Sequence, residues 1–391
     1  MRILLGGIPL GCDNIGDEAI IAAVVGMLKS SIPGVELTVA TADESTASLL
    51  DVRVVPPFGF AGRGLDGFVD EARRHDAYVW CGATGLSDYP HVALDLVEAA
   101  QNAGVPTFIW GVGMDDELNP VFFRVHGKRR LALSLLGLAG WYERRLRERL
   151  RRRIAAILPR CKGVWLRDPQ SAAMLASLGF GGAKVAADTA MLLPVPRPPF
   201  PPLLGHRLRR LASLGGCLPH SPSTLGLCIS TQRQVADLDG LKRLISAVRE
   251  SGANVLGIPM NPKTDRALLE SLGVECIPGT TPEAVMEAAA KCDIVLSSRL
   301  HLLILAANAG TPGLGIARGS KLANWLSNFG RTVEGSVFDC DWGKVTERVL
   351  AALGDRGDWD RVRDDAYARL NARLEAARKE FVERLEACHA G

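Results

Sequence analysis

The sequence lacks any long apolar run. Its longest apolar stretch, residues 131–141, is interrupted by Ser134, whereas a membrane-spanning helix needs about 20 consecutive apolar residues. The first residues lead directly into a glycine-rich turn and show neither the basic start nor the long apolar segment of a signal peptide. We therefore expect a cytoplasmic protein without a membrane span, and a peripheral contact with the membrane face remains open.

The usual cofactor and metal motifs are also missing. The nine cysteines include no CxxC pair, and none lies near paired histidines at the spacing of zinc ligands. Gly6, Gly7, Gly11 and Gly16 fit neither GxGxxG nor the phosphate loop GxxxxGK followed by Ser or Thr. We expect reduced and mostly buried thiols, no metal, and neither a nicotinamide nor ATP as cofactor.

Charge is balanced over the whole chain but not along it. The net charge is +3, yet residues 124–162 hold thirteen Lys and Arg against two acids. With only Trp141 and Tyr142 among these cations, the segment is a poor stacking platform, and we expect no nucleic-acid partner. Two interpretations remain open: a solvated helical face, or a surface that binds anionic lipid headgroups.

Short apolar runs alternate with helical patterns along the chain. Strands are predicted at residues 2–6, 35–40, 77–81, 107–111, 225–230, 254–259, 294–297 and 313–317. Helices are predicted at residues 17–32, 91–102, 238–251, 282–291, 299–309 and, as one long and largely exposed C-terminal helix, 361–388. This alternation is typical of parallel βαβ units with helices on both faces of the sheet.

A proline-rich segment divides this pattern in two. Six of the nine residues 194–202 are proline, a composition that no central strand or packed helix tolerates. We predict an N-terminal domain (1–193), a linker (194–223), a C-terminal domain (224–350) and a C-terminal helix (351–391). The predicted fold class is α/β, with two doubly wound Rossmann-like domains whose strand ends face a ligand-binding cleft.

The first polar motif joins the first predicted strand to the first helix. Residues 11–20, GCDNIGDEAI, combine backbone N–H groups at a helix start with the carboxylates of Asp17 and Glu18. Such groups can bind a hydroxylated substrate. Alternatively, Asn14 or Asp17 only caps the helix, and both interpretations remain open.

The second motif, SSRLH at residues 297–301, follows the predicted strand 294–297. Ser298 is the expected N-cap, which would place Arg299 and His301 in the first turn. Cations at a helix N-terminus are unfavourable unless an anion binds there. The motif therefore predicts an anion site, against the alternative of a snorkelling arginine and a hydrogen-bonded core histidine.

The third motif, WLRDPQS at residues 165–171, precedes another predicted helix. Asp168 followed by Pro169 is a typical helix start. Arg167 is the candidate functional residue, because a guanidinium group can bind a carboxylate or phosphate through two hydrogen bonds. Its alternative role is an ion pair with Asp168 or a neighbouring acid.

Taken in order, these motifs resemble the polysaccharide pyruvyl transferase family. The resemblance covers residues 3–330 and rests on GCDNIGDEAI, YVWCGATGLSD, GVGM, CKGVWLRDPQSAAMLASLG with ADTAMLL after it, and SSRLHLLILAANAGTPGLGIARGSKLANWLSNFG. The chain departs from the family pattern in the turn 81–85, where the family has three glycines. It also departs at Thr189, which replaces a proline, and at residues 319–321, GSK in place of DPK.

The resemblance implies a GT-B-like fold and a cell-envelope enzyme that transfers pyruvate from phosphoenolpyruvate to a sugar, forming a ketal. It places donor binding on Arg299, Leu300, His301 and Arg167. Because the donor carries both a phosphate and a carboxylate, we add Lys321 as a candidate for a second anion site. His301 is also the expected general acid/base, and no cofactor is expected besides the donor.

The remaining motif residues predict the acceptor side of the site. Asp17 is the second catalytic candidate, which would orient or deprotonate the acceptor hydroxyl. The residues expected to line the acceptor side or the cleft are Asn14, Gly16, Glu18, Gly82 and Gly85. The acceptor is a sugar or glycan, either soluble or lipid-linked, and the oligomeric state stays open. Alternatives are a nucleotide-sugar-dependent glycosyltransferase of the same fold and, more remotely, a non-catalytic binding protein.

Overall fold

The computed structural model describes residues 1–195, 222–230, 235, 237–355 and 357–390, with the backbone alone at 128, 129 and 390. The predicted linker lies outside the described residues apart from its two ends, and so does Cys217. No described cysteine takes part in a disulfide, and each is buried or partly buried. No helix in these ranges is long and apolar enough to cross a bilayer.

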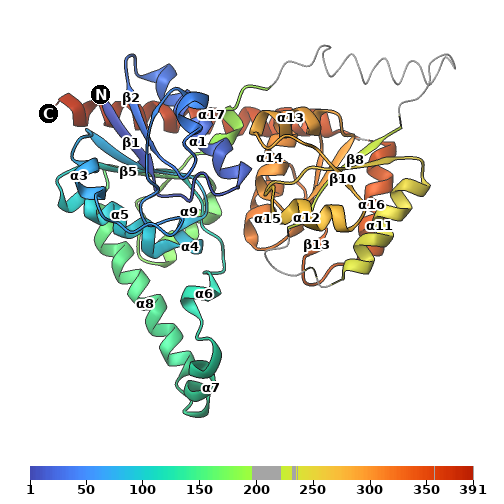
Figure 1. The fold of residues 1–391 in the computed structure, drawn as a ribbon, viewed down its shortest axis with the longest axis horizontal. Coiled ribbons are helices and arrows are strands. Elements are labelled where there is room, and N and C mark those ends of the chain that lie inside the picture. Colours follow the sequence, from blue (N-terminus) through green and yellow to red (C-terminus); the bar gives the residue numbers. More distant parts are fainter. Residues whose placement is uncertain (196–221, 231–234, 236, 356, 391) are drawn as a thin grey trace. The chain divides into compact units, whose positions relative to one another are not determined.

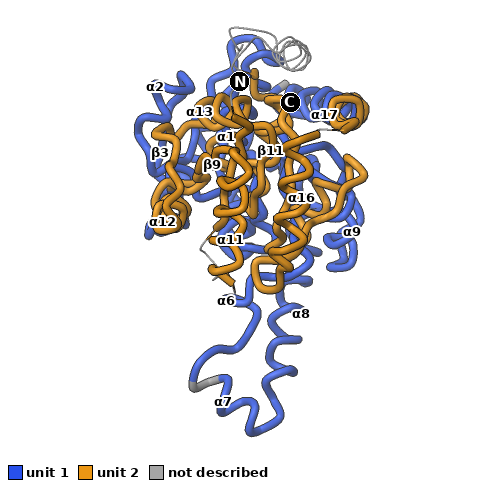
Figure 2. Tube along the Cα trace, turned by 90° about the vertical axis from the view of Figure 1, so that its right-hand side faces the viewer, with its two compact units in different colours: residues 1–12, 20–189, 369–391 blue, residues 13–19, 190–368 orange. Residues whose placement is uncertain are grey.

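The chain divides into two compact units, which Figure 2 colours separately. Unit 1 consists of Met1–Cys12, Ile20–Thr189 and Arg369–Gly391, and unit 2 of Asp13–Ala19 and Ala190–Ala368. This division differs from the predicted domain boundaries in two ways. The short segment 13–19 belongs to unit 2 although it precedes most of unit 1 in sequence, and the C-terminal helix has residues in both units.

Unit 1 is built on a seven-stranded parallel sheet with the order β3-β2-β1-β4-β5-β6-β7. Its strands are β1 (Arg2–Gly6), β2 (Glu36–Ala40), β3 (Arg53–Val55), β4 (Ala77–Cys81), β5 (Thr107–Val112), β6 (Gly163–Leu166) and β7 (Lys184–Val185). Every residue of β4 and β5 is buried, as expected for a sheet covered on both faces. The strand order reverses between β1 and β4.

Helices connect these strands, as Figure 1 shows. Besides the C-terminal helix, those with residues in unit 1 are α1 (Ile15–Ser31), α2 (Thr46–Leu50), α3 (Phe68–Ala72), α4 (Gly85–Asp88), α5 (Pro90–Asn102), α6 (Pro120–Phe123), α7 (Gly127–Leu135), α8 (Ala139–Ile157), the short 3-10 helix η1 (Leu158–Arg160), α9 (Pro169–Ser177) and the 3-10 helix η2 (Thr189–Leu192). The predicted helix start at Asp168 is confirmed, because its carboxylate accepts a hydrogen bond of 2.7 Å from the Ser171 N–H.

Unit 2 repeats the architecture with a six-stranded parallel sheet of order β10-β9-β8-β11-β12-β13. Its strands are β8 (Thr224–Cys228), β9 (Asn254–Gly257), β10 (Glu275–Cys276), β11 (Ile294–Ser297), β12 (Gly313–Ala317) and β13 (Gly335–Ser336). Its helices are α11 (Leu238–Glu250), α12 (Thr264–Ser271), α13 (Pro282–Ala290), α14 (Leu300–Asn308), α15 (Ser320–Ser327) and α16 (Trp342–Gly354). The strand order reverses between β8 and β11, so both units are doubly wound, as predicted.

The C-terminal helix α17 (Trp359–Ala390) is less exposed than predicted. Its buried side chains are Trp359, Ala366, Leu370, Leu374, Ala377, Phe381 and Leu385, a spacing that defines one apolar face. Within unit 1, the ring of Phe381 stacks on Trp110 with centroids 4.7 Å apart and meets the edge of Trp165. The alternating charges that suggested exposure occupy the other faces of the helix.

Candidate functional site

The candidate site of unit 2 lies at the carboxyl ends of β8, β11 and β12. In doubly wound sheets, ligands bind at these ends where the strand order reverses, here between β8 and β11. The chain leaves β11 through Ser298 and Arg299, and α14 begins at Leu300. The predicted N-cap is therefore wrong. Arg299 takes that position, and the Ser298 hydroxyl accepts a hydrogen bond of 2.8 Å from the Ser230 N–H after β8.

Arg299 is held by a buried carboxylate. Its Nε and Nη2 donate to the two oxygens of Asp265, at 3.0 and 2.8 Å. Burial lowers the pKa of the Arg299 guanidinium, but the Asp265 hydrogen bond and the charges of Asp265 and Asp17 outweigh it and raise this pKa above its ordinary value. Arg299 is therefore charged and fixed in orientation. One edge of the guanidinium group that was predicted to bind the donor already binds Asp265.

Asp265 is a site residue that the sequence analysis missed. It lies in the first turn of α12, is fully buried, and also accepts a hydrogen bond of 2.9 Å from the Asn261 N–H. The Cys228 thiol donates a hydrogen bond to Asp265 at 3.5 Å. The pKa of this thiol is raised, first by burial and then by the negative charge of Asp265. Asp265 precedes Arg299 by 34 residues, and no local pattern marks it. The available signal was a single acid at a helix start.

Residues 13–19 of the N-terminal motif lie in unit 2, beside the loop after β9. The Ile15 N–H donates to the Met260 carbonyl at 3.0 Å, and the Lys263 ammonium lies 2.5 Å from a carboxylate oxygen of Asp13. Asp13 has the left-handed φ of 59°, a conformation that Asp accepts more readily than most residues. Two contacts thus fasten segment 13–19 to the unit that carries Arg299.

The same segment places Gly16 against the imidazole of His301. A Cβ at residue 16 would lie 2.3 Å from His301 Nδ1, so no side chain fits there while the ring stays in place. Asn14 performs the predicted capping role, because its side chain accepts from the Gly16 N–H at 3.2 Å and donates to Asp17 at 2.6 Å. Asp17 is buried and close enough to Arg299 to raise its pKa, after the effects of burial and Asp265. The structure therefore brings these predicted residues together.

Cationic groups continue along the next strand end. Arg318 follows β12, and its Nη1 donates to the Ser230 hydroxyl at 3.2 Å. Lys321 lies in the first turn of α15, and the N-cap residues of α14 and α15, Arg299 and Gly319, make no side-chain capping hydrogen bond. Backbone N–H groups at uncapped helix starts, together with these cations, suit anion binding. Lys321 was among the predicted site residues, whereas Arg318 was not, although it directly follows the predicted strand 313–317.

Two predicted residues of this region have more ordinary surroundings. Leu300 is buried at the start of α14, where it joins the apolar core of the unit. Glu18 is half-buried in the first turn of α1.

Arg167 lies in unit 1, directly after β6. Its Nε is 3.3 Å from Asp168 and its Nη1 is 3.8 Å from Asp188, so the predicted ion pair exists. Its buried Nη2 has no hydrogen-bond partner among the described residues. A Cβ at Gly113 would lie 2.4 Å from the guanidinium carbon, which shows that the guanidinium packs closely on the backbone of Gly113.

The predicted acceptor glycines of unit 1 have clear packing roles. A Cβ at Gly82, which has a φ of 76°, would lie 2.3 Å from a methyl carbon of Ile20, and a Cβ at Gly85 would lie 2.5 Å from the ring of Trp80. Between them, Ala83 has a left-handed φ of 58°, which is unfavourable for alanine. The turn 81–85 is therefore specified by close backbone packing, whatever its part in binding.

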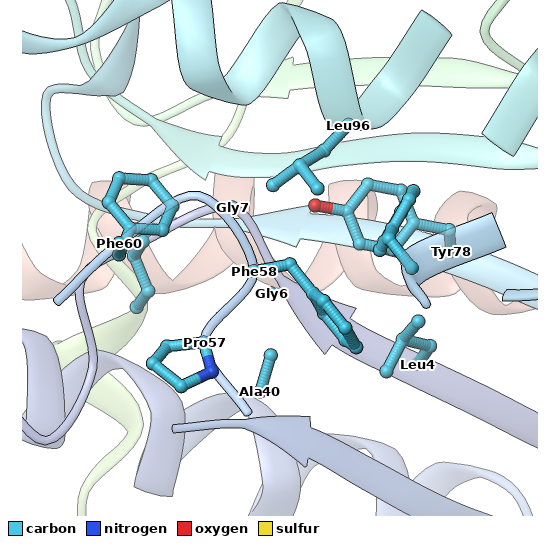
Figure 3. A pocket seen from close by; sticks show the side chains of 11 residues that line it. Leu4, Gly6, Gly7, Ala40, Pro57, Phe58, Phe60, Tyr78 and Leu96 are labelled. Carbon is cyan, nitrogen blue, oxygen red and sulfur yellow. The ribbon is translucent and has the colours of Figure 1, made fainter. Parts of the chain in front are cut away.

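The cavity in Figure 3 is not a substrate site. It lies in unit 1 among Leu4, Phe58, Phe60, Tyr78 and Leu96, and its volume is about 10 Å³, room for about one water molecule. The buried hydroxyl of Tyr78 has no hydrogen-bond partner among the described residues. Among the described residues of both units, no group of three or more His, Cys, Asp or Glu side chains could hold a metal ion.

Comparison with known proteins identifies the class of enzyme. A sequence model described as polysaccharide pyruvyl transferase matches residues 14–320, a range that includes Gly16, Arg299 and His301. The chain belongs to the polysaccharide pyruvyl transferase family and is a transferase, which confirms the predicted family and class. Comparison with the curated proteins finds no match.

Solved structures confirm the fold. UDP-GlcNAc 2-epimerase from Neisseria meningitidis matches with a TM-score of 0.58 at 13% identity, covering 99% of this chain and 100% of that one. Spinosyn rhamnosyltransferase SpnG matches with a TM-score of 0.56 at 17% identity, covering 98% and 99%. Glycosyltransferase VinC in complex with dTDP gives 0.54 at 14% identity, covering 99% and 100%. The predicted GT-B-like pair of Rossmann-like units is confirmed, while the predicted cleft stays a prediction.

Proposed function

We propose that this protein transfers pyruvate from phosphoenolpyruvate to two hydroxyl groups of a sugar in a glycan, forming a cyclic ketal and releasing phosphate. The observation that carries the proposal is the packing of Gly16 against the His301 ring, in the unit that also holds Asp17, Arg299 and Arg318. A candidate acid/base, an acceptor-side carboxylate and several cations thus belong to one compact unit.

The donor needs two anion sites, one for its phosphate and one for its carboxylate. Arg299 with the N-terminus of α14 supplies one in the proposal, with Leu300 forming its apolar side. Lys321 and Arg318, at the start of α15, supply the other. Arg167 of unit 1 is a further donor ligand in the proposal, because its Nη2 is a buried donor that no described residue accepts from. Asp265 positions Arg299 and does not touch the donor.

The reaction requires two oxygen–carbon bonds at the central carbon of the donor. When the first sugar hydroxyl adds there, the carbon–carbon double bond takes a proton at the methylene carbon, which becomes a methyl group. When the second hydroxyl adds, the carbon–oxygen bond to phosphate breaks and phosphate leaves with the electron pair. His301 is the proposed acid/base for these proton transfers, and Asp17 orients or deprotonates the acceptor. No metal, flavin or nicotinamide takes part in this scheme.

The acceptor side of the proposal includes Asn14, Gly16 and Glu18 of the N-terminal segment, with Gly82 and Gly85 shaping unit 1. The acceptor is a sugar of a cell-envelope glycan built in the cytoplasm, on a lipid carrier or free. The basic segment 124–162 gives the enzyme a peripheral contact with anionic membrane in this proposal. A lipid-linked acceptor and this contact support each other, because both bring the enzyme to the membrane face.

Donor-dependent thermal stability tests the proposal against its main rival, a nucleotide-sugar glycosyltransferase of the same fold. A ligand that binds only the folded protein raises the melting temperature. We expect phosphoenolpyruvate to raise it and UDP-N-acetylglucosamine to leave it unchanged at equal concentration. A shift with the nucleotide sugar alone would overturn pyruvyl transfer in favour of glycosyl transfer. If neither compound raises the melting temperature, binding of either donor is not supported and the non-catalytic alternative is favoured.

A further inference from the structure

The α7–α8 hairpin of unit 1 has no buried interior of its own. From 126 to 149, no side chain that the structure describes is buried. The C-terminal half of α8 attaches the hairpin to the unit through buried Leu150, Ile154 and Ile157. Figures 1 and 2 show α7 and the first half of α8 projecting away from the sheet of unit 1. The hairpin thus presents both of its helices to the surroundings.

Large apolar side chains gather at the end of this hairpin. The tip cluster consists of Leu131 (66% exposed), Leu135 (80%), Leu136 (69%), Leu138 (44%) and Trp141 (49%). These residues belong to the last turns of α7, the connecting turn and the first turn of α8. Several large, exposed apolar side chains on one short stretch of chain indicate an interaction site, and nothing in the described part of the chain covers them.

Arginines follow the tip cluster along α8. A groove of about 370 Å³ on α8 is lined by Tyr142, Arg145, Leu146, Arg149 and Arg152. The guanidinium of Arg145 also lies over the Trp141 ring, 5.2 Å from its centroid. Segment 124–162 as a whole holds thirteen cations and two acids. The occupant of this surface must therefore offer both an apolar interior and many negative charges.

An anionic bilayer meets both requirements, whereas a second copy of the hairpin does not. A symmetric dimer would place the same arginine-rich surfaces against each other, and like charges oppose such an interface. A bilayer offers hydrocarbon for leucine and phosphate groups for arginine, and tryptophan favours the boundary between them. The charge pattern and the apolar tip point to the same occupant.

We propose that the α7–α8 hairpin is a membrane anchor whose tip cluster inserts below the headgroups of an anionic bilayer, while the arginines of α8 bind the lipid phosphates. This inference specifies how the membrane contact of the proposed function is made and rests on that contact. It adds insertion of apolar side chains to electrostatic attraction. Insertion resists salt better than surface attraction does, because salt screens charges and not apolar burial.

Trp141 provides a direct reporter of insertion. It is exposed, whereas the other six of the seven tryptophans, at 80, 110, 165, 325, 342 and 359, are buried. With phosphatidylglycerol vesicles we expect Trp141 emission to shift to shorter wavelength and to be quenched by bromine atoms on the acyl chains. Phosphatidylcholine vesicles should give neither effect, and Trp141→Phe should lose both. Unchanged emission of the parent with anionic vesicles at low salt would overturn the membrane contact and the insertion together.

Vesicle flotation of variants separates insertion from charge. We expect the double variant Leu135→Ser with Leu136→Ser to bind anionic vesicles at least tenfold more weakly, and Leu49→Ser, an equally exposed leucine on α2, to bind like the parent. Arg145→Ala with Arg149→Ala should also weaken binding. Arg153 is left intact because it pairs with Asp95 at 2.7 Å.

Three outcomes decide the proposal. Parent-like flotation of the double leucine variant would overturn insertion and leave the electrostatic contact. If the parent fails to bind vesicles and instead forms a concentration-dependent dimer that the leucine variant abolishes, the occupant is a second copy of the chain. The anchor would then be overturned. Retained transfer to a soluble acceptor by the leucine variant is expected, and it distinguishes failure of the anchor from failure of the proposed reaction.

Discussion

Arg299 and Arg167 occupy similar places in the two units but use their guanidinium groups differently. Each follows the carboxyl end of a parallel strand closely, β11 in unit 2 and β6 in unit 1. Arg299 forms two short hydrogen bonds with both oxygens of Asp265. Arg167 lies 3.3 Å and 3.8 Å from two separate carboxylates, and its Nη2 is left without a partner among the described residues.

The difference separates two uses of an arginine that sequence alone cannot tell apart. A bidentate, buried pair fixes the orientation of Arg299 and compensates its charge within the protein. A loosely paired arginine with a spare donor is better suited to receive an anion from outside. We infer that Arg299 chiefly organises the site around His301, and that Arg167 gains more from the donor when it binds.

The largest effect is expected from His301→Ala, which removes the proposed acid/base. Turnover should fall about 100-fold or more, the usual loss for such a group, while phosphoenolpyruvate affinity stays within about tenfold. Steady-state assays of phosphate release and calorimetry of donor binding measure the two quantities. Unchanged turnover would remove His301 from the mechanism and, with it, the assignment of the chemistry to unit 2.

The comparison of the two arginines predicts unequal stability losses when their carboxylates are removed. Asp265→Ala leaves the Arg299 guanidinium buried without its partner and should cost about 3 kcal/mol of unfolding free energy. Asp168→Ala removes an N-cap and a longer ion pair and should cost about 1 kcal/mol. Urea unfolding of the parent and both variants checks this order. Equal losses of unfolding free energy would show that the ion pair of Arg299 stabilises the protein no more than that of Arg167.

Most of the architecture could be predicted from the sequence because apolar periodicity is local. Every predicted strand is present, with bounds within two residues. The short edge strands β3, β7, β10 and β13 were missed, since each has only two or three residues and carries no periodic signal. Buried elements with long apolar runs are therefore easier to predict than edges.

The site could be predicted only in part, because its contacts link distant segments. The motifs around Gly16 and Arg299 were found. Their position in one unit could not be predicted, because no sequence pattern indicates that residues 13–19 belong to unit 2. Asp265 and Arg318 were missed for the same reason. Ser298 was misassigned as a cap because the Ser230 N–H, from another strand end, competes for its hydroxyl.

Replacing each arginine by lysine tests whether Arg167 or Arg299 contributes more to donor binding. Arg167→Lys keeps the charge but loses the planar fork, and we expect phosphoenolpyruvate to bind about tenfold more weakly with little change in stability. Arg299→Lys breaks the bidentate pair, so its main effect should be on unfolding free energy, with a smaller loss of affinity. The reverse pattern in calorimetry would make Arg299 the principal donor ligand and contradict our inference.

Gly16→Ala tests whether the N-terminal segment sets the position of His301. The new Cβ would lie 2.3 Å from His301 Nδ1, so the ring or the segment must move, and turnover should fall about tenfold. Gly26→Ala is the matched control, because it lies on the same helix and a Cβ there meets no described atom within 4 Å. It should keep full activity. Similar losses in both variants would point to a general effect on α1.

The smallest effect is expected at Ala83 in unit 1. Its left-handed φ of 58° costs alanine about 1–2 kcal/mol, part of which glycine recovers despite its more flexible unfolded state. Ala83→Gly should therefore stabilise the protein by at most about 1 kcal/mol, seen as a small rise in the urea midpoint. A loss of stability would mean that the methyl group contributes more through packing than the backbone loses through strain.

Mass spectrometry of the glycan product decides whether this protein transfers pyruvate. The enzyme is incubated with phosphoenolpyruvate and a panel of soluble and lipid-linked glycans, with His301→Ala as the control. Pyruvyl transfer predicts a product whose mass exceeds that of one acceptor by one pyruvic acid less one water, formed together with an equal amount of phosphate and absent with the variant. Transfer of a sugar from a nucleotide donor to the same panel, with no such ketal from phosphoenolpyruvate, would contradict the account.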